Sequence, residues 1–524
     1  MEITCTTLLA CYAILSGLLL NQVHTQPASE WYQQGRQSIE RALELEDFNL
    51  NVAKNAILFL GDGMGVATLA SARIKKGQDL GSTGEEHQLE FEKFPHLALS
   101  KTYNTNYQVS DSAGTATAFL AGAKTKRGVV GQDDRAIRGD CAASSGSDIP
   151  SILEIAQQHG KSVGIVTTTR VTHATPAAAY AHIPDRDWEA DSDIPSGEQG
   201  KGCTDIALQM VENHGIQVVM GGGRQKFMLN TQRDPEAGIL PQFGDRQDGR
   251  DLIKEWVDGK PEGSAVYVWN EDDFENVDPT KTDYLLGLFD RSHMTFEDNR
   301  GNDNAGEPHI ANMTRKAIEI LSKNVNGFFL LVEGGRIDHA HHANTAYSAV
   351  YDTIAFDEAV KMAKDMTSSS ETLIVVTADH SHTNTFSGYP NRGNPILGKN
   401  DRGVGSDGLP YTTVMYSDGP GGVTVTQSYQ NNGLRPNITD TDTEQVIYVS
   451  QALVSRASAS HAGEDVTIFA DGPMAHLFHG VHEQSYIPHV MQYASCIGDY
   501  STPCRAVTRD SRAFIKGKIQ RYDW

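Results

Sequence analysis

Short apolar runs recur along the chain and end abruptly in turns that are rich in glycine or acidic residues. Runs of about five apolar residues suit strands that are buried on both faces, as in a parallel sheet. Helix-like stretches lie between them, at 149–158, 313–322 and 346–366. The alternation predicts an α/β fold with a large, mostly parallel central sheet flanked by helices on both faces. The predicted strands are Ala56–Leu60, Val163–Val166, Val218–Met220, Phe328–Val332 and Leu373–Val376.

The segment 386–450 departs from this alternation. It is rich in Gly, Asn, Asp, Ser, Thr and Pro, and holds short strand-like pieces such as Tyr411–Tyr416. We interpret it as a small inserted subdomain, with a disordered linker as the alternative. Residues 26–50 are predicted to form an N-terminal helix, because apolar side chains recur there at roughly helical spacing: Tyr32, Ile39, Leu43 and Leu45.

Composition and charge narrow the function. Hydrophobic residues make up 39% of the 524 positions and charged residues 21%, which is typical of a globular protein. The net charge of −23 argues against binding to nucleic acid or to an anionic membrane, since both need a basic surface. The length exceeds the roughly 250–300 residues that one core supports, so we expect two domains or one large α/β domain with insertions.

Both ends of the chain bear on localisation. Residues 1–25 are predicted to be a secretory signal peptide, because the apolar run at 8–20 is too short to span a bilayer comfortably. No positive charge precedes this run, which leaves a short N-terminal anchor as the alternative. The tail 506–524 is polar and basic and lacks the hydrophobic segment of a GPI signal. We expect a secreted protein without an evident membrane anchor, GPI-anchored only if the sequence is truncated.

The cysteines and sequons agree with secretion. Four cysteines would remain after cleavage of the signal peptide, an even number that suits an oxidising compartment. They are Cys141, Cys203, Cys496 and Cys504. Three pairings exist; local closure favours Cys496–Cys504, which leaves Cys141–Cys203, and free buried thiols are the alternative. N-glycosylation sequons begin at Asn312 and Asn437.

Carboxylates follow three of the predicted strands: Asp62, Glu333 and Asp379. In an open parallel sheet, ligands bind beyond the carboxyl ends of the strands. A buried carboxylate is costly unless a cation or hydrogen bonds satisfy it. Three of them at one rim would repel one another, so the pattern indicates a positive partner, most simply metal ions.

Histidines supply a second set of candidate ligands. Asp338 and His342 are four residues apart, so a helix would direct both side chains to one face. His380 and His382 follow Asp379, and His461 lies in the motif SHAGED. Histidine with carboxylate indicates zinc, whereas oxygen ligands alone suit magnesium. Spacing does not choose among His339, His341 and His342, and we interpret a later cluster as structural or surface histidines: His476, His479 and His482.

Ser112 is the candidate nucleophile. It precedes a run of small, helix-compatible residues, and a helix N-terminus favours phosphate and an ionised oxygen. No catalytic base is evident beside it, but a metal ion can take that role. Arg170 and Arg186 have the planar fork that suits two phosphate oxygens. The sequence does not decide which of the two arginines points inward.

Six motifs, in this order, resemble those of the animal alkaline phosphatases: FLGDGMG, DSAGTATA, TTTRVTHATPAAAYAH, EGGRIDHAHH, TADHSH and HAGEDV. The resemblance spans about residues 30–505. It implies a catalytic domain over 26–505, with 386–450 as the family's variable crown-like insertion. It also implies a homodimer that hydrolyses phosphate monoesters through a phosphoserine.

The resemblance assigns roles residue by residue. Ser112 would become phosphorylated, and Arg186 would bind the phosphate. The ligands of one zinc ion would be Asp338, His342 and His461, and those of the second zinc ion would be Asp62, Ser112, Asp379 and His380. The ligands of a magnesium ion would be Asp62, Thr175 and Glu333, with a threonine where many animal members have serine. His173 would lie near the magnesium and His382 near the zinc pair.

Animal members also carry a peripheral calcium site. Its counterparts here would be Glu236, the Phe289 carbonyl, Asp290 and Glu307. Two other classes remain as alternatives: a related metal-dependent phosphodiesterase, phosphomutase or sulfatase, and a catalytically silent binding protein. The pair of motifs DSAG and TADHSH favours a phosphatase, and every expected ligand position holds a competent residue.

Overall fold

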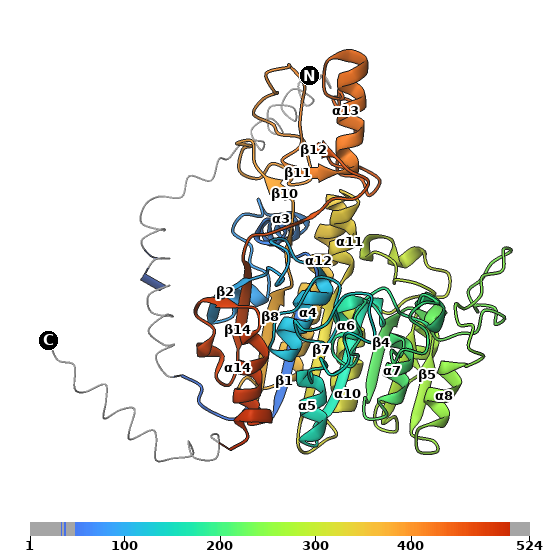
Figure 1. The fold of residues 1–524 in the computed structure, drawn as a ribbon. Helices are drawn as coiled ribbons and strands as arrows, with labels where there is room; N and C mark the ends of the chain where they lie inside the picture. Colours follow the sequence, from blue (N-terminus) through green and yellow to red (C-terminus); the bar gives the residue numbers. More distant parts are fainter. Residues whose placement is uncertain (1–32, 34–35, 38–47, 503–524) are drawn as a thin grey trace, which may run out of the picture. The chain divides into compact units, whose positions relative to one another are not determined.

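The structure, a computed structural model, describes residues 33, 36–37 and 48–502 (Figure 1). The chain divides into the units Met1–Phe48 and Asn49–Trp524, and the fold below belongs to the second. The predicted signal peptide 1–25, the tail 506–524 and Cys504 lie outside the described residues. So does most of the helix expected over 26–50.

The core of the second unit is a ten-stranded sheet in the order β15-β2-β14-β8-β1-β7-β3-β4-β6-β5. Strand β14 is antiparallel to both of its neighbours, and all the other neighbours run parallel. The central strands are β8 (Thr372–Ala378), β1 (Asn55–Gly61), β7 (Phe328–Gly334), β3 (Ser162–Arg170) and β4 (Val218–Gly222). The outer strands are β15 (Gly480–Glu483), β2 (His96–Lys101), β14 (Val466–Asp471), β6 (Tyr284–Leu288) and β5 (Ala265–Val268).

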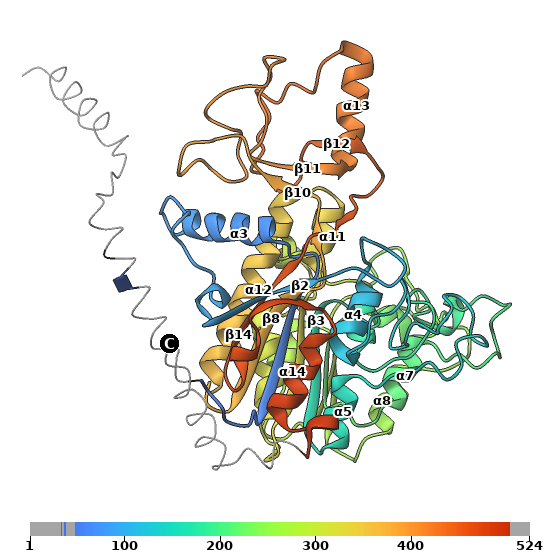
Figure 2. The ribbon, with the colours of Figure 1, turned by 60° about the vertical axis from the view of Figure 1, so that its left-hand side comes forward.

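Helices cover both faces of this sheet (Figures 1 and 2). Alternate residues of one strand point to opposite faces, so Ile57 and Phe59 of β1 enter one apolar core and Leu58 and Leu60 the other. This double burial explains the continuous apolar runs. The predicted mostly parallel α/β fold is confirmed. On the Ile57 side lie α3 (Val66–Asp79), α10 (Ile310–Leu321) and α12 (Ala346–Met366); on the Leu58 side lie α4 (Ser112–Ala121), α5 (Ile152–Gln158) and α14 (Tyr486–Ser495).

The inserted segment folds as a small subdomain beyond one end of the main sheet, where α13 projects outward (Figure 2). The segment contains strand β11 and helix α13, and β11 pairs with β10 and β12 at the two ends of the segment, so the alternative of a disordered linker is wrong. The helix α13 escaped prediction because its glycines, threonines and asparagines are weak helix formers. Its elements are β10 (Asn384–Phe386), β11 (Val414–Gly419), α13 (Pro420–Asn432) and β12 (Ala452–Ser455).

Cys141 and Cys203 form a disulfide with 5.6 Å between their Cα atoms, which confirms that pairing. Cys496 is also disulfide-bonded. Of the sequons, Asn437 is exposed in the insertion, whereas Asn312 is partly buried in the first turn of α10. Among the described residues, no helix combines the length and apolar character needed to cross a bilayer.

Candidate metal centre and nucleophile

The three carboxylates predicted to meet at one rim do so. Asp62 follows β1, Glu333 lies at the end of β7, and Asp379 follows β8. These strands are neighbours, and their register pairs Leu60 with Glu333 and Gly61 with Ala378. All three carboxylates are fully buried. Around them, three groups of side chains have ligand atoms within 4.8 Å of one another.

The first group contains Asp338, His342, His382 and His461. Helix α11 (Arg336–His342) places His342 one turn after Asp338, with 3.2 Å between Nε2 and the carboxylate. His382 contacts the same carboxylate, and His461 Nε2 lies 3.4 Å from it. A two-stranded sheet pairs β9 (Ser381–His382) with β13 (His461–Ala462), so the backbone itself sets these two histidines opposite each other.

The structure separates the three histidines that spacing could not. His341 is buried between the Thr68 hydroxyl at 2.9 Å and the Tyr416 hydroxyl at 2.8 Å, so its role is in packing. His339 contacts the rings of His293 and His173. His342 alone of the three joins a metal group in the described part of the chain. The late histidines do not: His482, for example, stacks on Tyr486 at 4.0 Å.

The second group joins Asp62, Asp379 and His380 to the serine. Ser112 Oγ lies 3.3 Å from His380 Nε2 and 3.5 Å from an Asp62 oxygen. The Gly63 amide donates to Asp379 at 3.0 Å, which ties the turn after β1 to the end of β8. The His380 ring stacks on His461 with 3.5 Å between centroids, so the first and second groups adjoin.

The third group contains Asp62, His173 and Glu333, so Asp62 is shared with the second. Two threonines of β3, Thr167 and Thr169, donate to one oxygen of Glu333. Thr175, the predicted magnesium ligand, lies in the short helix α6 (Ala174–Ala177) and is fully buried. His173, expected near the magnesium, falls within this group.

Asp111, which sequence reasoning missed, connects the candidate nucleophile Ser112 to Arg186, the arginine predicted to bind phosphate. Its carboxylate caps α4 by accepting from the Gly114 amide at 3.2 Å, so Ser112 occupies the first helical position. It also pairs with Arg186 at 3.2 Å, and Arg186 contacts His173 at 3.0 Å. An aspartate directly before a predicted helix is a recognisable capping signal. Arg170 instead pairs with Glu189, donating from Nε and from one terminal nitrogen to the two carboxylate oxygens.

The buried carboxylates at the rim of the sheet lack enough positive charge around them, which favours the binding of a cation. Burial raises the pKa of Asp62 well above its usual range, and the charges of Asp379, Asp338 and Glu333 add to this. Burial likewise raises the pKa of Glu333 to about 7. Within the described chain, Asp62 Oδ2 and Glu333 Oε1 are buried without a hydrogen-bond partner. Burial lowers the pKa of His173, His382 and His461 and so favours the neutral imidazole that binds metal. Burial acts in the same direction on His342 and His380, but the adjacent Asp338 and Asp379 outweigh it and raise their pKa values, which shows how strongly these carboxylates attract positive charge. The donor sets therefore fit divalent ions.

Comparison with known proteins decides the family. The alkaline phosphatase family model matches residues 53–497. The alkaline phosphatase of Gadus morhua is 50% identical over 470 residues, covering 89% of this chain and 97% of that one. The tissue-nonspecific isozyme of Homo sapiens is 48% identical over 493 residues, covering 94% and 92%. This chain belongs to the alkaline phosphatase family.

Solved structures of alkaline phosphatases share the fold. The enzyme from the Antarctic bacterium TAB5 has a TM-score of 0.58 at 22% identity, covering 86% of this chain and all of that one. The enzyme of Thermus thermophilus has a TM-score of 0.59 at 23% identity, covering 91% and 95%. As a member of this metal-dependent family, the chain is an enzyme that hydrolyses phosphate monoesters. The alternative of a silent binding protein is therefore wrong.

The phosphatase site opens to solvent through a hollow of about 330 Å³ beside Ser112. Its wall includes residues of the first metal group and Arg186, the predicted phosphate-binding arginine. Two further arginines, which sequence reasoning did not single out, stand in the same wall. The lining residues are Asp111, Ser112, Arg127, Arg138, His173, Arg186, Asp187, Asp338, His339, His342 and His461.

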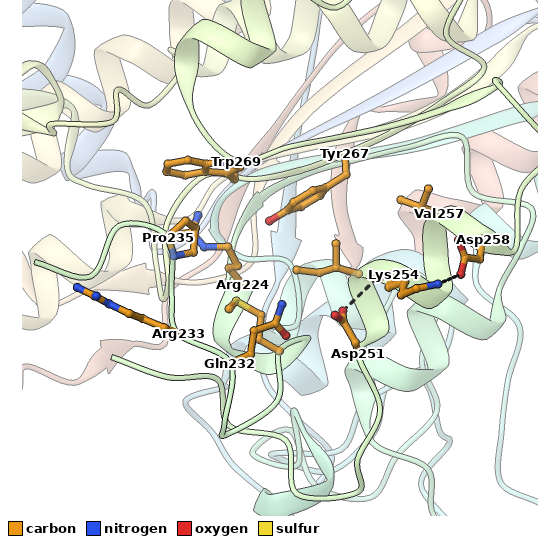
Figure 3. Close-up of a pocket in the computed structure, with 12 residues that line it drawn as sticks. Arg224, Gln232, Arg233, Pro235, Asp251, Lys254, Val257, Asp258, Tyr267 and Trp269 are labelled. Carbon is orange, nitrogen blue, oxygen red and sulfur yellow. Dashed lines mark hydrogen bonds and ion pairs between the residues drawn. The ribbon is translucent and has the colours of Figure 1, made fainter. Parts of the chain in front are cut away.

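The predicted calcium residues gather in a different part of the molecule. Burial raises the pKa of Glu307 to about 8, with contributions from Asp290, Asp303 and Glu236. Asp303 was absent from the prediction. Glu236 pairs with Arg224, which lies beside Trp269 in a surface pocket of about 440 Å³ (Figure 3). These carboxylates do not form a group as tight as the other three among the described residues, and Phe289 is buried at the end of β6.

Proposed function

We propose that this chain hydrolyses phosphate monoesters to an alcohol and inorganic phosphate through a covalent phosphoserine at Ser112. The observation that carries the proposal is the position of Ser112. Its hydroxyl stands at the start of α4 and contacts Asp62 and His380 of the second metal group. A hydroxyl so placed meets both a helix N-terminus and a cation-binding cluster, and both favour an oxyanion.

The proposal includes two zinc ions and one magnesium ion. Histidine-containing groups suit zinc, while the oxygens of Asp62, Thr175 and Glu333 suit magnesium. When bound, the metals supply positive charge that favours the ionised hydroxyl and offsets charge on the phosphoryl oxygens. One zinc ion would be held by Asp338, His342 and His461, and the other by Asp62, Ser112, Asp379 and His380.

The reaction has two steps, formation of the phosphoserine and its hydrolysis, and residues of the chain act in both. Ser112 gives its hydroxyl proton to water and attacks phosphorus through Oγ; the ester bond to the leaving oxygen breaks, and the alcohol departs with a proton returned from water. A water molecule then attacks the phosphoserine, which releases phosphate and restores the hydroxyl. Arg186 presents its planar fork to two phosphoryl oxygens, and Asp111 holds the guanidinium in place. Positioning and charge compensation carry most of such a reaction because the transition state is loose.

Replacement of the nucleophile tests this proposal. Ser112→Ala, loaded with zinc and magnesium, is expected to lose at least about 1,000-fold in kcat for p-nitrophenyl phosphate. Acid quenching during turnover should trap phosphate on the Ser112 peptide of the wild type and not of the variant. The exposed Ser145→Ala is the matched control. Wild-type activity in Ser112→Ala would show that another group accepts the phosphoryl.

We further propose that the protein is a secreted, glycosylated homodimer. The signal-like residues 1–25, the disulfide between Cys141 and Cys203, and the exposed sequon at Asn437 support secretion and glycosylation, whereas the homodimer rests on the analogy with the family. The calcium site at Glu236, Phe289, Asp290 and Glu307 stays part of the proposal, supported by the gathering of its carboxylates. Light scattering, glycosidase digestion and metal analysis of secreted protein test these points. A monomer in light scattering would contradict the homodimer, and a gel band that glycosidase does not shift would contradict glycosylation. Protein without calcium would contradict the calcium site.

A further inference from the structure

We propose that Arg127 forms a second anion-binding position at the mouth of the Ser112 pocket. There it would favour phosphate monoesters whose leaving group carries another phosphate or a carboxylate. This inference rests on the proposed function of Ser112 and deepens it by naming a class of substrate. It arises from the three arginines that line the pocket, Arg127, Arg138 and Arg186.

Two of these guanidinium groups already have carboxylate partners. Arg186 pairs with Asp111 at 3.2 Å and contacts His173, as the phosphate-binding role requires. Arg138 pairs with Asp185 at 3.1 Å and with Asp187 at 2.9 Å. The three acids in the wall of the pocket are therefore engaged elsewhere: Asp111 and Asp187 with these arginines, and Asp338 with the histidines of the first metal group.

The guanidinium of Arg127 differs from the other two. It lies over the Tyr107 ring, 5.3 Å from the centroid, and the residue is exposed. Within the described chain, no carboxylate lies within ion-pair distance of it. The neighbouring Lys126 donates to the Ala136 carbonyl at 3.0 Å and so turns away from competing for an anion. Arg127 thus presents uncompensated charge at the rim.

The backbone around Arg127 is held in a fixed position relative to the nucleophile. The Arg127 amide donates to Asn106 at 3.0 Å. The next amide, of Gly128, donates to both oxygens of Asp111 at 3.1 and 3.0 Å. Asp111 also caps the helix that begins at Ser112, so one carboxylate links the arginine to the reacting hydroxyl. Stacking on Tyr107 further limits the side chain.

This arrangement matches one kind of substrate. The reacting phosphoryl group occupies the site of Ser112 and Arg186, and the leaving group extends toward the mouth. A phosphate or carboxylate on that leaving group would meet the planar fork of Arg127, which can donate to two oxygens at once. A neutral leaving group gains nothing from the same residue. The preference should also weaken with added salt, because the position is exposed.

Matched esters test the inference. The neutral probe is 4-carbamoylphenyl phosphate, and the charged probes are 4-carboxyphenyl phosphate and the bisphosphate of benzene-1,4-diol. In Arg127→Ala, the ratio of kcat/KM for charged over neutral ester is expected to fall about threefold to tenfold, mainly through KM. Arg127→Lys should keep part of the preference. Comparison of the two charged probes tells whether carboxylate or phosphate fits better.

Arg135→Ala is the matched control, because Arg135 is exposed and pairs with Asp133 away from the pocket lining. Its ratio should equal that of the wild type. An unchanged ratio in Arg127→Ala, measured while the wild type hydrolyses the neutral ester, overturns the Arg127 proposal and leaves the Ser112 proposal standing. An equal fall of the charged-over-neutral ratio in Arg127→Ala and Arg135→Ala also overturns the Arg127 proposal, because the preference would then reflect the overall charge of the protein.

Discussion

At the scale of single residues, Asp111 concentrates several functions in one carboxylate. It caps α4, accepts from two backbone amides and pairs with Arg186. Burial opposes its charge, but Arg186 and the amides of Gly128 and Gly114 hold the pKa of Asp111 below its usual range. Asp111 is therefore ionised at neutral and alkaline pH. The position of Arg186 depends on that charge.

Asp111→Asn separates these functions, because asparagine still caps a helix but cannot form the ion pair. We expect the inhibition constant of inorganic phosphate to rise about threefold to tenfold, since Arg186 is no longer held in place. Competitive inhibition against p-nitrophenyl phosphate measures this. The control is Asp133→Asn, which removes the ion pair between Asp133 and Arg135. Unaltered phosphate inhibition in Asp111→Asn would mean that Arg186 is oriented without Asp111.

The sequence reached some residues of the site and not others for a physical reason. Asp62, Glu333 and Asp379 stand at the ends of apolar runs, where a buried charge is conspicuous. Asp111 is adjacent to Ser112 in the sequence, but its ion pair with Arg186 and the position of Arg127 at the pocket appear only in the folded chain. His342 could not be chosen over His339 by spacing, because all three histidines of that segment lie on one helical turn or next to it.

At the scale of elements, the turn between β1 and α3 depends on Gly63. Its φ is +70°, and a Cβ atom there would lie 2.6 Å from the His382 ring and 3.1 Å from the Asp338 backbone. The turn therefore packs directly against the first metal group. A side chain at this position would meet the predicted zinc ligand Asp338 and His382, which was predicted to lie near the zinc pair.

Gly63→Ala is expected to reduce zinc content and to lower kcat/KM at least about tenfold, because the clash displaces Asp338 and His382. Gly81→Ala is a matched control with the same kind of backbone strain, since φ is +82° there and no atom lies within 4 Å of the added Cβ. Elemental analysis and a phosphatase assay distinguish the two variants. Full zinc occupancy in Gly63→Ala would disprove the displacement.

A second element, α5, is tied to its surroundings by an ion pair that depends on pH. Burial lowers the pKa of His182, but Glu154, 3.0 Å away, and the Gly131 carbonyl outweigh it and raise the pKa above its usual 6.5. Burial opposes ionisation of Glu154, yet His182 and Ser151 hold its pKa below 4.5. The stabilisation from His182 is complete below 6.5 and is lost as pH rises through its folded value. That from Glu154 is complete above 4.5 and is lost as pH falls.

The coupling energy of this pair is therefore expected to be largest between pH 4.5 and 6.5, at about 0.5–1 kcal/mol, and to weaken at alkaline pH. A double-mutant cycle with His182→Gln and Glu154→Gln, followed by thermal unfolding at pH about 6 and about 9, measures it. Coupling that grows toward alkaline pH would contradict the assigned charges.

The elements show where a sequence pattern stops being informative. The helix over 346–366 appears as α12 (Ala346–Met366), and α5 begins at Ile152 because Ser151 caps it with Glu154 in a capping box. The strands β2, β14 and β15 were not predicted. β2 and β15 are short and partly exposed, and in β14 the polar Thr467 interrupts the apolar residues. The strands β5 and β6 on the other side of the sheet were also not predicted, although β6 is mostly buried. Strand order, which places β14 against β8, is set by tertiary packing.

At the scale of the whole molecule, the metal groups connect parts of the chain that are far apart in sequence. Asp62, Asp338 and His461 come from the first, middle and last parts of the described chain, and their ligand groups adjoin. Buried carboxylates that repel one another destabilise the fold unless cations are bound. Bound ions should therefore stabilise the entire second unit.

Removal of metal with a chelator is expected to lower the midpoint of thermal unfolding by at least about 5 °C and to abolish turnover. Readdition of zinc with magnesium should restore both, and calcium alone should not restore turnover. Differential scanning calorimetry and elemental analysis give the result. An unchanged midpoint in protein shown to lack metal would mean that the carboxylates at the rim are satisfied by other means.

The pairing of β9 with β13 joins the two ends of the crown-like insertion at the metal centre. His382 lies in one strand of this short ribbon and His461 in the other. The chain between them forms a loop whose two ends are held together by the paired strands. Such a loop can change in length or composition during evolution without shifting either ligand. Conversely, a partner that binds the crown-like insertion and displaces it would move His382 and His461 together. Binding at the insertion could therefore alter the metal group that contains both histidines.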